Sequence, residues 1–147
     1  MSALVSYALQ GVHQKDPAEE IWDDLKDLLP LVKRIGGADV LVAVYKRPEK
    51  VRGKSGIEFI LPDRTRDEDD VQGVAGLVVM MGPLAYKYEK TARWFVDENG
   101  DPAPPKIGDW VTFDVKVTHP MLLGERMCRL VHDQYIRAIV ARPDIVA

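Results

Sequence analysis

The sequence predicts a small all-β protein with one N-terminal helix, built as an antiparallel sandwich or barrel with two long loops. Three observations lead to this prediction. After Asp39 the spacing of apolar residues changes from the helical period of about 3.6 residues to alternation and short apolar runs. No helical pattern of roughly 10–15 residues separates these runs, so parallel crossover units are not expected. Two connections, 46–70 and 82–106, are longer than compact domains usually leave without structure.

The helix is predicted to begin at Asp16. This residue supplies an N-cap acceptor, Pro17 suits the first helical position, and Glu19 is placed to complete the cap. The apolar residues that follow share one face: Ile21, Trp22, Leu25, Leu28 and Leu29. We interpret this stripe as core packing in preference to a partner-binding face, with Trp22 kept as a candidate contact.

The helix is expected to end or kink near Leu29. Pro30 lies within the apolar pattern and lacks the backbone N–H that a helix interior needs. The Gly36-Gly37 pair marks a definite stop before the next element. The helix should therefore be short and lie on another part of the protein.

Four strands are predicted from apolar runs at 40–45, 74–81, 109–117 and 135–141, and a weaker run around Gly124, at 121–131, predicts one more hairpin. The third strand alternates, because every second residue is apolar. Its apolar face is predicted to hold Val111, Phe113, Val115 and Val117.

The two long connections are the candidate binding segments. The 46–70 connection carries a basic block, the apolar stretch 57–61 interrupted only by Glu58, and then an acidic block. The 82–106 connection holds four aromatic residues, an Asp97–Gly100 turn and a proline-rich return. Apolar loop centres on a small scaffold are typical of proteins that bind other proteins. The aromatic residues are Tyr86, Tyr88, Trp94 and Phe95.

Composition excludes several classes of protein. The 147 residues fit one ordinary domain, and a single cysteine cannot form an internal disulfide. The net charge of −3 argues against nonspecific nucleic-acid binding, and no apolar run is long enough to span a bilayer. The first ten residues lack the charged start and apolar stretch of a signal peptide, so a soluble intracellular protein is expected.

Motifs for catalysis, metals or nucleotides are weak. Gly53-Lys54-Ser55 resembles the end of a phosphate-binding loop, but Pro48 stands where that motif needs glycine. The acidic segments 67–70 and 97–101 lack calcium-loop spacing and are better interpreted as solvated turns. Cys128 and His132 could share a strand face, yet a buried thiol is the preferred interpretation because no third orienting group is evident. We expect a protein that is not an enzyme and needs no metal or cofactor.

Five segments in chain order resemble the GroES, or chaperonin-10, family, and in particular the GroES-like proteins encoded by tailed bacteriophages. The resemblance covers about 100 residues, and its motif 106–113 is similar to the family pattern Gly-Asp-x-Val-x-Phe/Tyr. The segments are VLVAV at 40–44, SGI at 55–57 with LPD at 61–63, QG at 72–73 leading to LVVMMGP at 77–83, KIGDWVTF at 106–113 and CRLVHDQYIRAIV at 128–140.

The resemblance implies an irregular antiparallel β-barrel that assembles into rings, with strands from the two chain ends meeting across the subunit boundary. It also implies that the 46–63 loop is a mobile loop whose apolar tip docks on a chaperonin, and that the loop after Gly82 is a roof loop. By position, the tip corresponds to Ile57, Phe59, Ile60 and Leu61.

The sequence is thus predicted to divide into an N-terminal extension, 1–38, and a GroES-like domain, 39–147. The favoured hypothesis is a non-enzymatic structural protein of a tailed-phage virion, present in the bacterial cytoplasm during assembly, that binds head proteins and forms a homo-oligomer. Its contacts would come from Trp22 and the aromatic residues of the 82–106 loop. The alternative hypothesis is a phage-encoded co-chaperonin that caps a chaperonin through the 57–61 tip to assist capsid protein folding. Neither hypothesis involves a membrane or specific nucleic acid.

Overall fold

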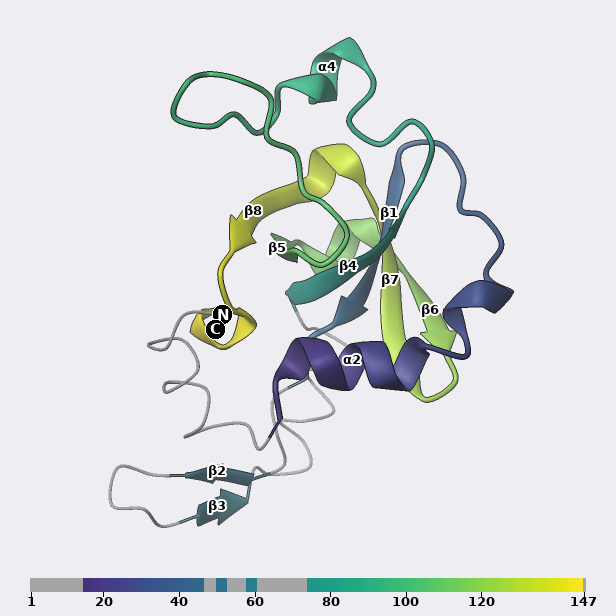
Figure 1. Ribbon diagram of the computed structural model, residues 1–147, viewed down its shortest axis with the longest axis vertical. Coiled ribbons are helices and arrows are strands. Elements are labelled where there is room, and N and C mark those ends of the chain that lie inside the picture. Colours follow the sequence, from purple (N-terminus) through teal and green to yellow (C-terminus); the bar gives the residue numbers. More distant parts are fainter. Residues whose placement is uncertain (1–14, 47–49, 53–57, 61–73, 147) are drawn as a thin grey trace.

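The computed structural model describes residues 15–46, 50–52, 58–60 and 74–146, and for 50–52 and 58–60 it describes the backbone alone. These residues form a six-stranded antiparallel sheet, a separate two-stranded sheet and one main helix (Figure 1). The predicted fold class, all-β with one N-terminal helix, is confirmed. Within the described part of the chain, no helix is long and apolar enough to cross a membrane.

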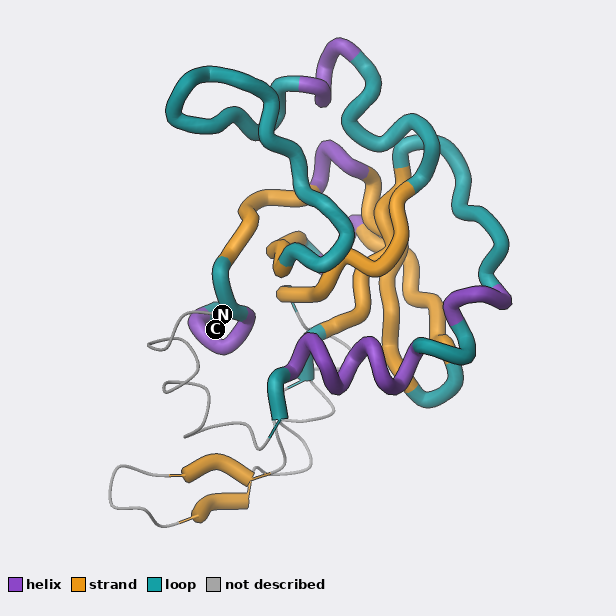
Figure 2. The backbone as a smooth tube through the Cα atoms, in the orientation of Figure 1, coloured by secondary structure: helices purple, strands orange, loops and turns teal. Residues whose placement is uncertain are grey.

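The backbone path in Figure 2 separates into short strands, one main helix and several single helical turns. In chain order the elements are α2 (Pro17–Leu25), η1 (Leu29–Leu31), β1 (Asp39–Val44), β2 (Lys50–Arg52), β3 (Glu58–Ile60), β4 (Ala75–Met81), α4 (Glu89–Ala92), β5 (Trp110–Phe113), η2 (Val115–Val117), β6 (Thr118–Leu123), β7 (Arg126–His132), η3 (Asp133–Tyr135), β8 (Ile136–Val140) and η4 (Pro143–Ile145).

Strand β1 lies in the middle of the large sheet, whose order is β6-β7-β1-β4-β5-β8. It pairs antiparallel with β4 and β7, so that Leu41 stands opposite Met80 on one side and Leu130 on the other. The two edges of this sheet are β6 and β8. Strands β2 and β3 pair with each other, with Lys50 opposite Ile60, and this hairpin within the 46–70 connection was not predicted from the sequence.

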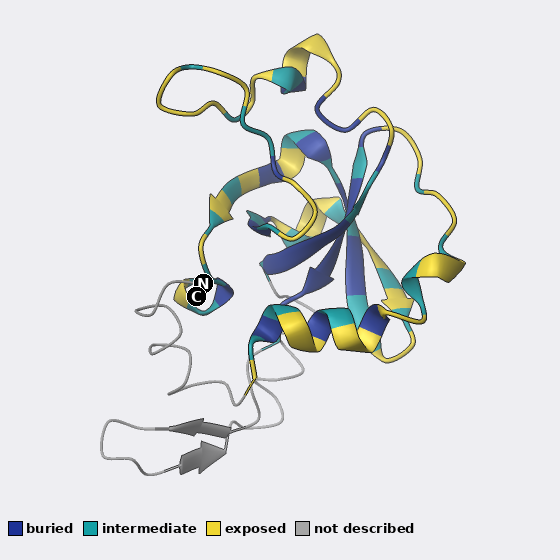
Figure 3. Ribbon diagram, in the orientation of Figure 1, coloured by how far each residue is buried: buried dark blue, intermediate teal, exposed yellow. Residues whose placement is uncertain are grey.

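Two apolar cores lie on opposite faces of β1. Leu41 and Ala43 enter one core, whereas Val40 and Val42 enter the other, as expected from the alternation of side chains along a strand. Ile21 and Leu25 of α2 cover the first core. The second core includes Ala85 and Tyr86, which follow β4, and Ile136 at the start of β8. Burial on both faces explains why β1 is a continuous apolar run (Figure 3).

The helix ends at Leu25, earlier than the predicted end near Leu29. Asp16 caps its start as predicted, because the carboxylate accepts a hydrogen bond from the Ala18 backbone N–H at 2.9 Å. After Leu25 the chain tightens, and Leu28 N–H donates to the Leu25 carbonyl at 3.0 Å. Pro30 follows in the η1 turn, where its fixed φ and missing N–H suit a tighter helix better than an α-helix interior.

The strand predicted over 109–117 is correct only in its first half. Val111 and Phe113 are buried as expected, but β5 ends at Phe113. The Asp114 carboxylate then accepts a hydrogen bond from Lys116 N–H at 3.0 Å, which turns the chain into η2. Val117 is consequently exposed. The alternation of apolar residues thus extends beyond the end of the strand, into a turn.

The remaining strand predictions are confirmed. The runs at 40–45, 74–81 and 135–141 correspond to β1, β4 and β8. The weaker run around Gly124 forms the β6–β7 hairpin, in which Leu123 pairs with Arg126. Gly124 has a φ of 61°, a left-handed conformation that glycine adopts without steric cost.

Substitution Leu25→Ala tests whether the helix is part of the core. Leu25 is fully buried, so we expect the free energy of unfolding to fall by about 2–5 kcal/mol. Leu31→Ala is the matched control, because Leu31 is 74% exposed and its truncation should cost less than about 0.5 kcal/mol. Urea unfolding followed by tryptophan fluorescence gives both values. Equal midpoints for the two variants would show that α2 does not contribute to the core.

Candidate functional site

Residues 82–106 form a lobe that arches away from the sheet between β4 and β5, and we call them the roof segment (Figure 1). The segment starts at Gly82, whose N–H donates to the Asp39 carbonyl at 2.8 Å. A Cβ at this position would lie 2.4 Å from the Gly37 carbonyl oxygen, closer than real contacts allow. A residue with a side chain at position 82 would therefore clash with the chain that leads into β1, and glycine avoids this clash.

The outer part of the roof segment combines the α4 turn with a hairpin-like loop. Val96 and Pro102 form an isolated antiparallel bridge. The Asp97 carboxylate accepts hydrogen bonds from Asn99 N–H at 2.9 Å and from Asp101 N–H at 3.0 Å. The predicted Asp97–Gly100 turn is confirmed, because the Asp97 carboxylate and carbonyl accept the backbone hydrogen bonds that close it.

Tyr86 and Asp133 fasten the base of the roof segment to the η3 turn between β7 and β8. The Tyr86 backbone N–H donates to the Asp133 carboxylate at 2.8 Å, and the Tyr86 hydroxyl donates to the Asp133 carbonyl at 2.9 Å. Asp133 is fully buried, and its own N–H donates to the Ala38 carbonyl at 3.0 Å. Tyr86 has a φ of 59°, a conformation that costs a residue other than glycine roughly 1–3 kcal/mol. The two hydrogen bonds and the burial of the ring offset that cost.

The electrostatics of this contact keep the tyrosine protonated. Burial, and secondarily the negative charge of Asp133, raise the pKa of Tyr86 well above its usual value. The hydroxyl therefore remains a donor even in basic solution. The second carboxylate oxygen of Asp133 lies 3.0 Å from Nδ1 of His132, but the two atoms lack hydrogen-bond geometry, so we regard this approach as an ion pair only when His132 is protonated.

The roof segment also exposes large apolar side chains. Tyr88, Trp94 and Val96 are each about half exposed, and Leu84 is 40% exposed. Trp94 is oriented by a hydrogen bond from its indole N–H to the Ile136 carbonyl at 3.3 Å. Single exposed apolar residues are common on protein surfaces, whereas several on one lobe are typical of a surface that contacts another protein.

The structure separates the aromatic residues that the sequence placed together. Tyr88 and Trp94 are exposed, whereas Tyr86 is buried and Phe95 is partly buried against it, with ring centroids 6.1 Å apart in an edge-to-face arrangement. Trp22 is partly buried and packs against the core beneath α2. Of the predicted tip residues, Ile57 and Leu61 lie outside the described residues, and Phe59 and Ile60 are described only as backbone of β3.

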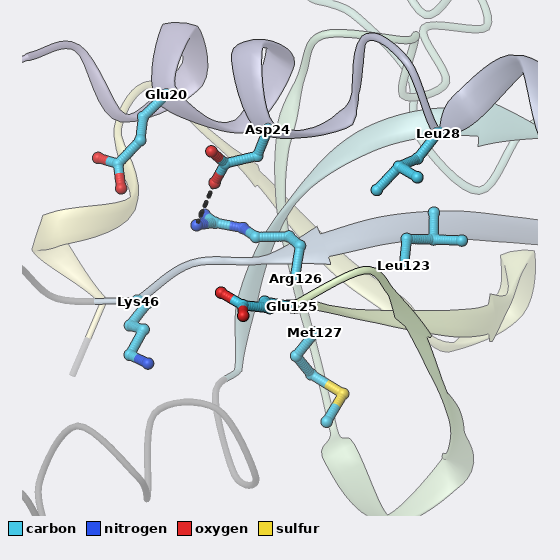
Figure 4. A pocket seen from close by; sticks show the side chains of 8 residues that line it. All are labelled: Glu20, Asp24, Leu28, Lys46, Leu123, Glu125, Arg126 and Met127. Atoms are coloured by element: carbon cyan, nitrogen blue, oxygen red, sulfur yellow. Dashed lines mark hydrogen bonds and ion pairs between the residues drawn. The ribbon is translucent and has the colours of Figure 1, made fainter.

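Sequence reasoning missed a polar cleft of about 380 Å³ between α2 and the β6–β7 hairpin (Figure 4). Arg126 extends from β7 towards α2, and its guanidinium group lies 3.4 Å from the Asp24 carboxylate and 3.4 Å from the Val44 carbonyl. Glu20 and Glu125 add further negative charge to the cleft. These residues are about 100 positions apart in the sequence, and no local pattern indicates that they meet.

The buried interpretation of Cys128 is confirmed. The thiol has no exposed surface, and it lies on β7 opposite Ala43 of β1. Burial raises the pKa of Cys128 to about 11, despite the opposing effect of the nearby Arg126 charge. The reactive thiolate is therefore strongly disfavoured near neutral pH. Among the described residues no group of three or more His, Cys, Asp or Glu side chains could hold a metal ion.

No protein-family model matches the sequence, and no curated protein matches it. The resemblance to the GroES family therefore stays a prediction from the five sequence segments.

Asp133→Ala tests the fastening of the roof segment. Loss of the buried acceptor leaves the Tyr86 N–H without a partner, so we expect the free energy of unfolding to fall by about 1–3 kcal/mol. Tyr86→Phe removes only the hydroxyl contact and should cost about 1 kcal/mol. Glu98→Ala, at an exposed position of the same lobe, is the control and should leave stability unchanged. Urea unfolding measures all three, and an Asp133→Ala midpoint equal to that of the control would contradict the assignment.

Proposed function

We propose that this chain is a non-enzymatic structural protein of a tailed-phage virion, a GroES-fold subunit that binds the phage head or a head-associated protein. The resemblance of the sequence to the GroES family supports the GroES-fold part of this proposal. The observation that carries the binding part is the roof segment, whose base is fixed by the Tyr86–Asp133 contact while Tyr88, Trp94 and Val96 stay exposed.

A fixed lobe with exposed aromatic side chains suits protein binding for energetic reasons. Tyrosine and tryptophan are enriched in protein interfaces, where they contribute much of the binding energy. Binding costs free energy when loops and side chains become ordered, and a lobe that is already fixed avoids part of that cost. Trp94 already donates a hydrogen bond to the Ile136 carbonyl, which restricts its ring before any partner arrives.

The edge position of β8 supports the homo-oligomeric part of the proposal. Within the described residues β8 pairs with β5 alone, so one side of its backbone is not paired with another strand. Such an edge can pair with a strand of another chain. The GroES resemblance implies that strands from the two chain ends meet in this way between subunits.

Incorporation into particles tests the structural role. The chain should occur at stoichiometric copy number in purified virions of the encoding phage, as counted by quantitative mass spectrometry. Tyr88→Ser combined with Val96→Ser should lower the copy number at least about tenfold, because truncating central interface residues often costs more than 1 kcal/mol each. Trp94 is left intact because its indole N–H also donates to the Ile136 carbonyl of β8.

Leu122→Ser is the matched control for this experiment, because Leu122 is a similarly exposed apolar residue on β6. This variant should enter virions at the normal copy number. Absence of the wild-type chain from virions would contradict the structural role itself. Equal incorporation of the roof variant and the control would contradict only the assignment of the contact to the roof segment.

The alternative proposal is a co-chaperonin, and the β2–β3 hairpin is the observation that favours it. The hairpin lies in the 46–63 segment, where the resemblance implies a chaperonin-binding tip, and Glu58–Ile60 is an extended strand. An extended apolar segment can dock into a hydrophobic groove of a partner. Its binding would depend on Phe59 and Ile60.

Co-elution of the chain with a GroEL-type chaperonin and ADP, together with suppressed ATP hydrolysis, would support the alternative proposal. Ile60→Asp should then abolish both effects, because a charge in the tip opposes burial in an apolar groove. Leu122→Asp, which places the same charge on β6, should abolish neither. Failure of the wild-type chain to co-elute would contradict the co-chaperonin role.

A further inference from the structure

A second surface feature lies at the base of the roof segment and plays no part in the proposed virion contact. It is an open groove of about 550 Å³ between the start of the segment, 82–87, and its return to the sheet, 104–107. Its apolar lining residues include Met81, Ala85, Pro104, Pro105 and Ile107. Ile107 is 58% exposed, and Pro105, two residues earlier, is buried.

Both walls of the groove are held in place by hydrogen bonds. On the outgoing wall, Leu84 N–H donates to the Gly37 carbonyl at 2.9 Å, and Tyr86 is fastened to Asp133. On the returning wall, Lys106 N–H donates to the Asp109 carboxylate at 2.9 Å, directly after two prolines whose φ angles are fixed by their rings. The groove is therefore formed before any ligand binds, which reduces the entropic cost of binding.

The charged residues that line the groove are both lysines. Lys87 lies on the outgoing wall and Lys106 on the returning wall, and both are exposed. Within the described part of the chain, neither ammonium group forms an ion pair, whereas Lys15 and Arg142 pair with Asp23 and Asp144. None of the described residues that line the groove is acidic, and the nearby Asp109 carboxylate binds the backbone N–H of Lys106.

We propose that this groove binds an acidic peptide segment of a partner protein, with one apolar side chain on the proline floor and carboxylates near Lys87 and Lys106. Apolar pockets with a few charged groups at their rim are typical ligand sites. The open shape favours a peptide over an enclosed small molecule, because Ile107 and both lysines remain exposed to solvent. The lysine charges favour carboxylates by electrostatic complementarity.

Fluorescence anisotropy with two labelled peptides tests the proposal. The probe is the extended peptide Asp-Glu-Phe-Leu-Glu-Asp, and the charge-reversed comparison is Lys-Lys-Phe-Leu-Lys-Lys. We expect the acidic peptide to bind and to lose roughly tenfold in affinity between about 50 mM and about 500 mM salt, because exposed ion pairs are screened. The basic peptide should not bind.

Charge reversal locates the site. Lys87→Glu combined with Lys106→Glu should abolish binding of the acidic peptide, and Ile107→Ser should weaken it severalfold by removing an apolar contact. The control is Lys26→Glu combined with Lys116→Glu, which changes the net charge by the same amount. Both residues are exposed, Lys26 at the C-terminal end of α2 and Lys116 in η2, so this variant should still bind the acidic peptide. Urea unfolding should show that all these variants remain folded.

The proposal fails if the wild-type chain binds neither peptide, if it binds both equally, or if the two double variants bind the acidic peptide equally. Binding of decanoate without binding of the acidic peptide would identify a small-molecule pocket and would also overturn it. The Tyr88→Ser, Val96→Ser variant should still bind the acidic peptide. This site can therefore fail or succeed independently of the proposed virion contact.

Discussion

The structure depends on the burial of β1 on both of its faces. A strand in the middle of a sheet with apolar side chains on both sides is stable only if each face is covered. Helix α2 covers one face through Ile21 and Leu25, and the base of the roof segment covers the other through Ala85 and Tyr86. The N-terminal helix and the roof segment, which lie far apart in the sequence, thus perform the same physical task on opposite sides of one strand.

The Tyr86–Asp133 contact connects this packing requirement to the candidate binding surface. A buried carboxylate is costly unless it receives hydrogen bonds, and Tyr86 supplies one from its backbone N–H. The same tyrosine closes the second core and adopts a left-handed conformation at the start of the lobe. This one contact between distant parts of the chain therefore contributes both to the second core and to the position of the roof segment.

Charge is distributed differently in the cleft beneath α2 and in the groove at the base of the roof segment. The cleft beneath α2 is lined by charges of both signs, and Arg126 in it forms an ion pair with Asp24 of the helix. The groove at the base of the roof segment has an apolar floor and only lysine charges at its rim. Because of this difference in charge, we propose the groove, and not the cleft, as the site for an acidic partner.

Much of the fold was predictable because it follows from local patterns. The Asp16 cap, the continuous run of β1 and the turn at Gly124 each depend on residues that are adjacent in the sequence. The two errors arose where a local turn replaced a regular element. A tighter turn before Pro30 ends α2 earlier than predicted. The hydrogen bond from Lys116 N–H to the Asp114 carboxylate turns the chain after β5, although the apolar alternation continues.

The candidate site was predictable only in part. The aromatic content of the 82–106 connection indicated a contact segment, but its periodicity did not distinguish buried Tyr86 from exposed Tyr88. By itself the sequence determined the class of fold and the chemical nature of the side chains in the two long connections. Only the tertiary structure decided which of those side chains face solvent, because that depends on Asp133 and on the pairing of distant strands, and hydrogen bonds between residues 47 positions apart leave no periodic pattern in the chain.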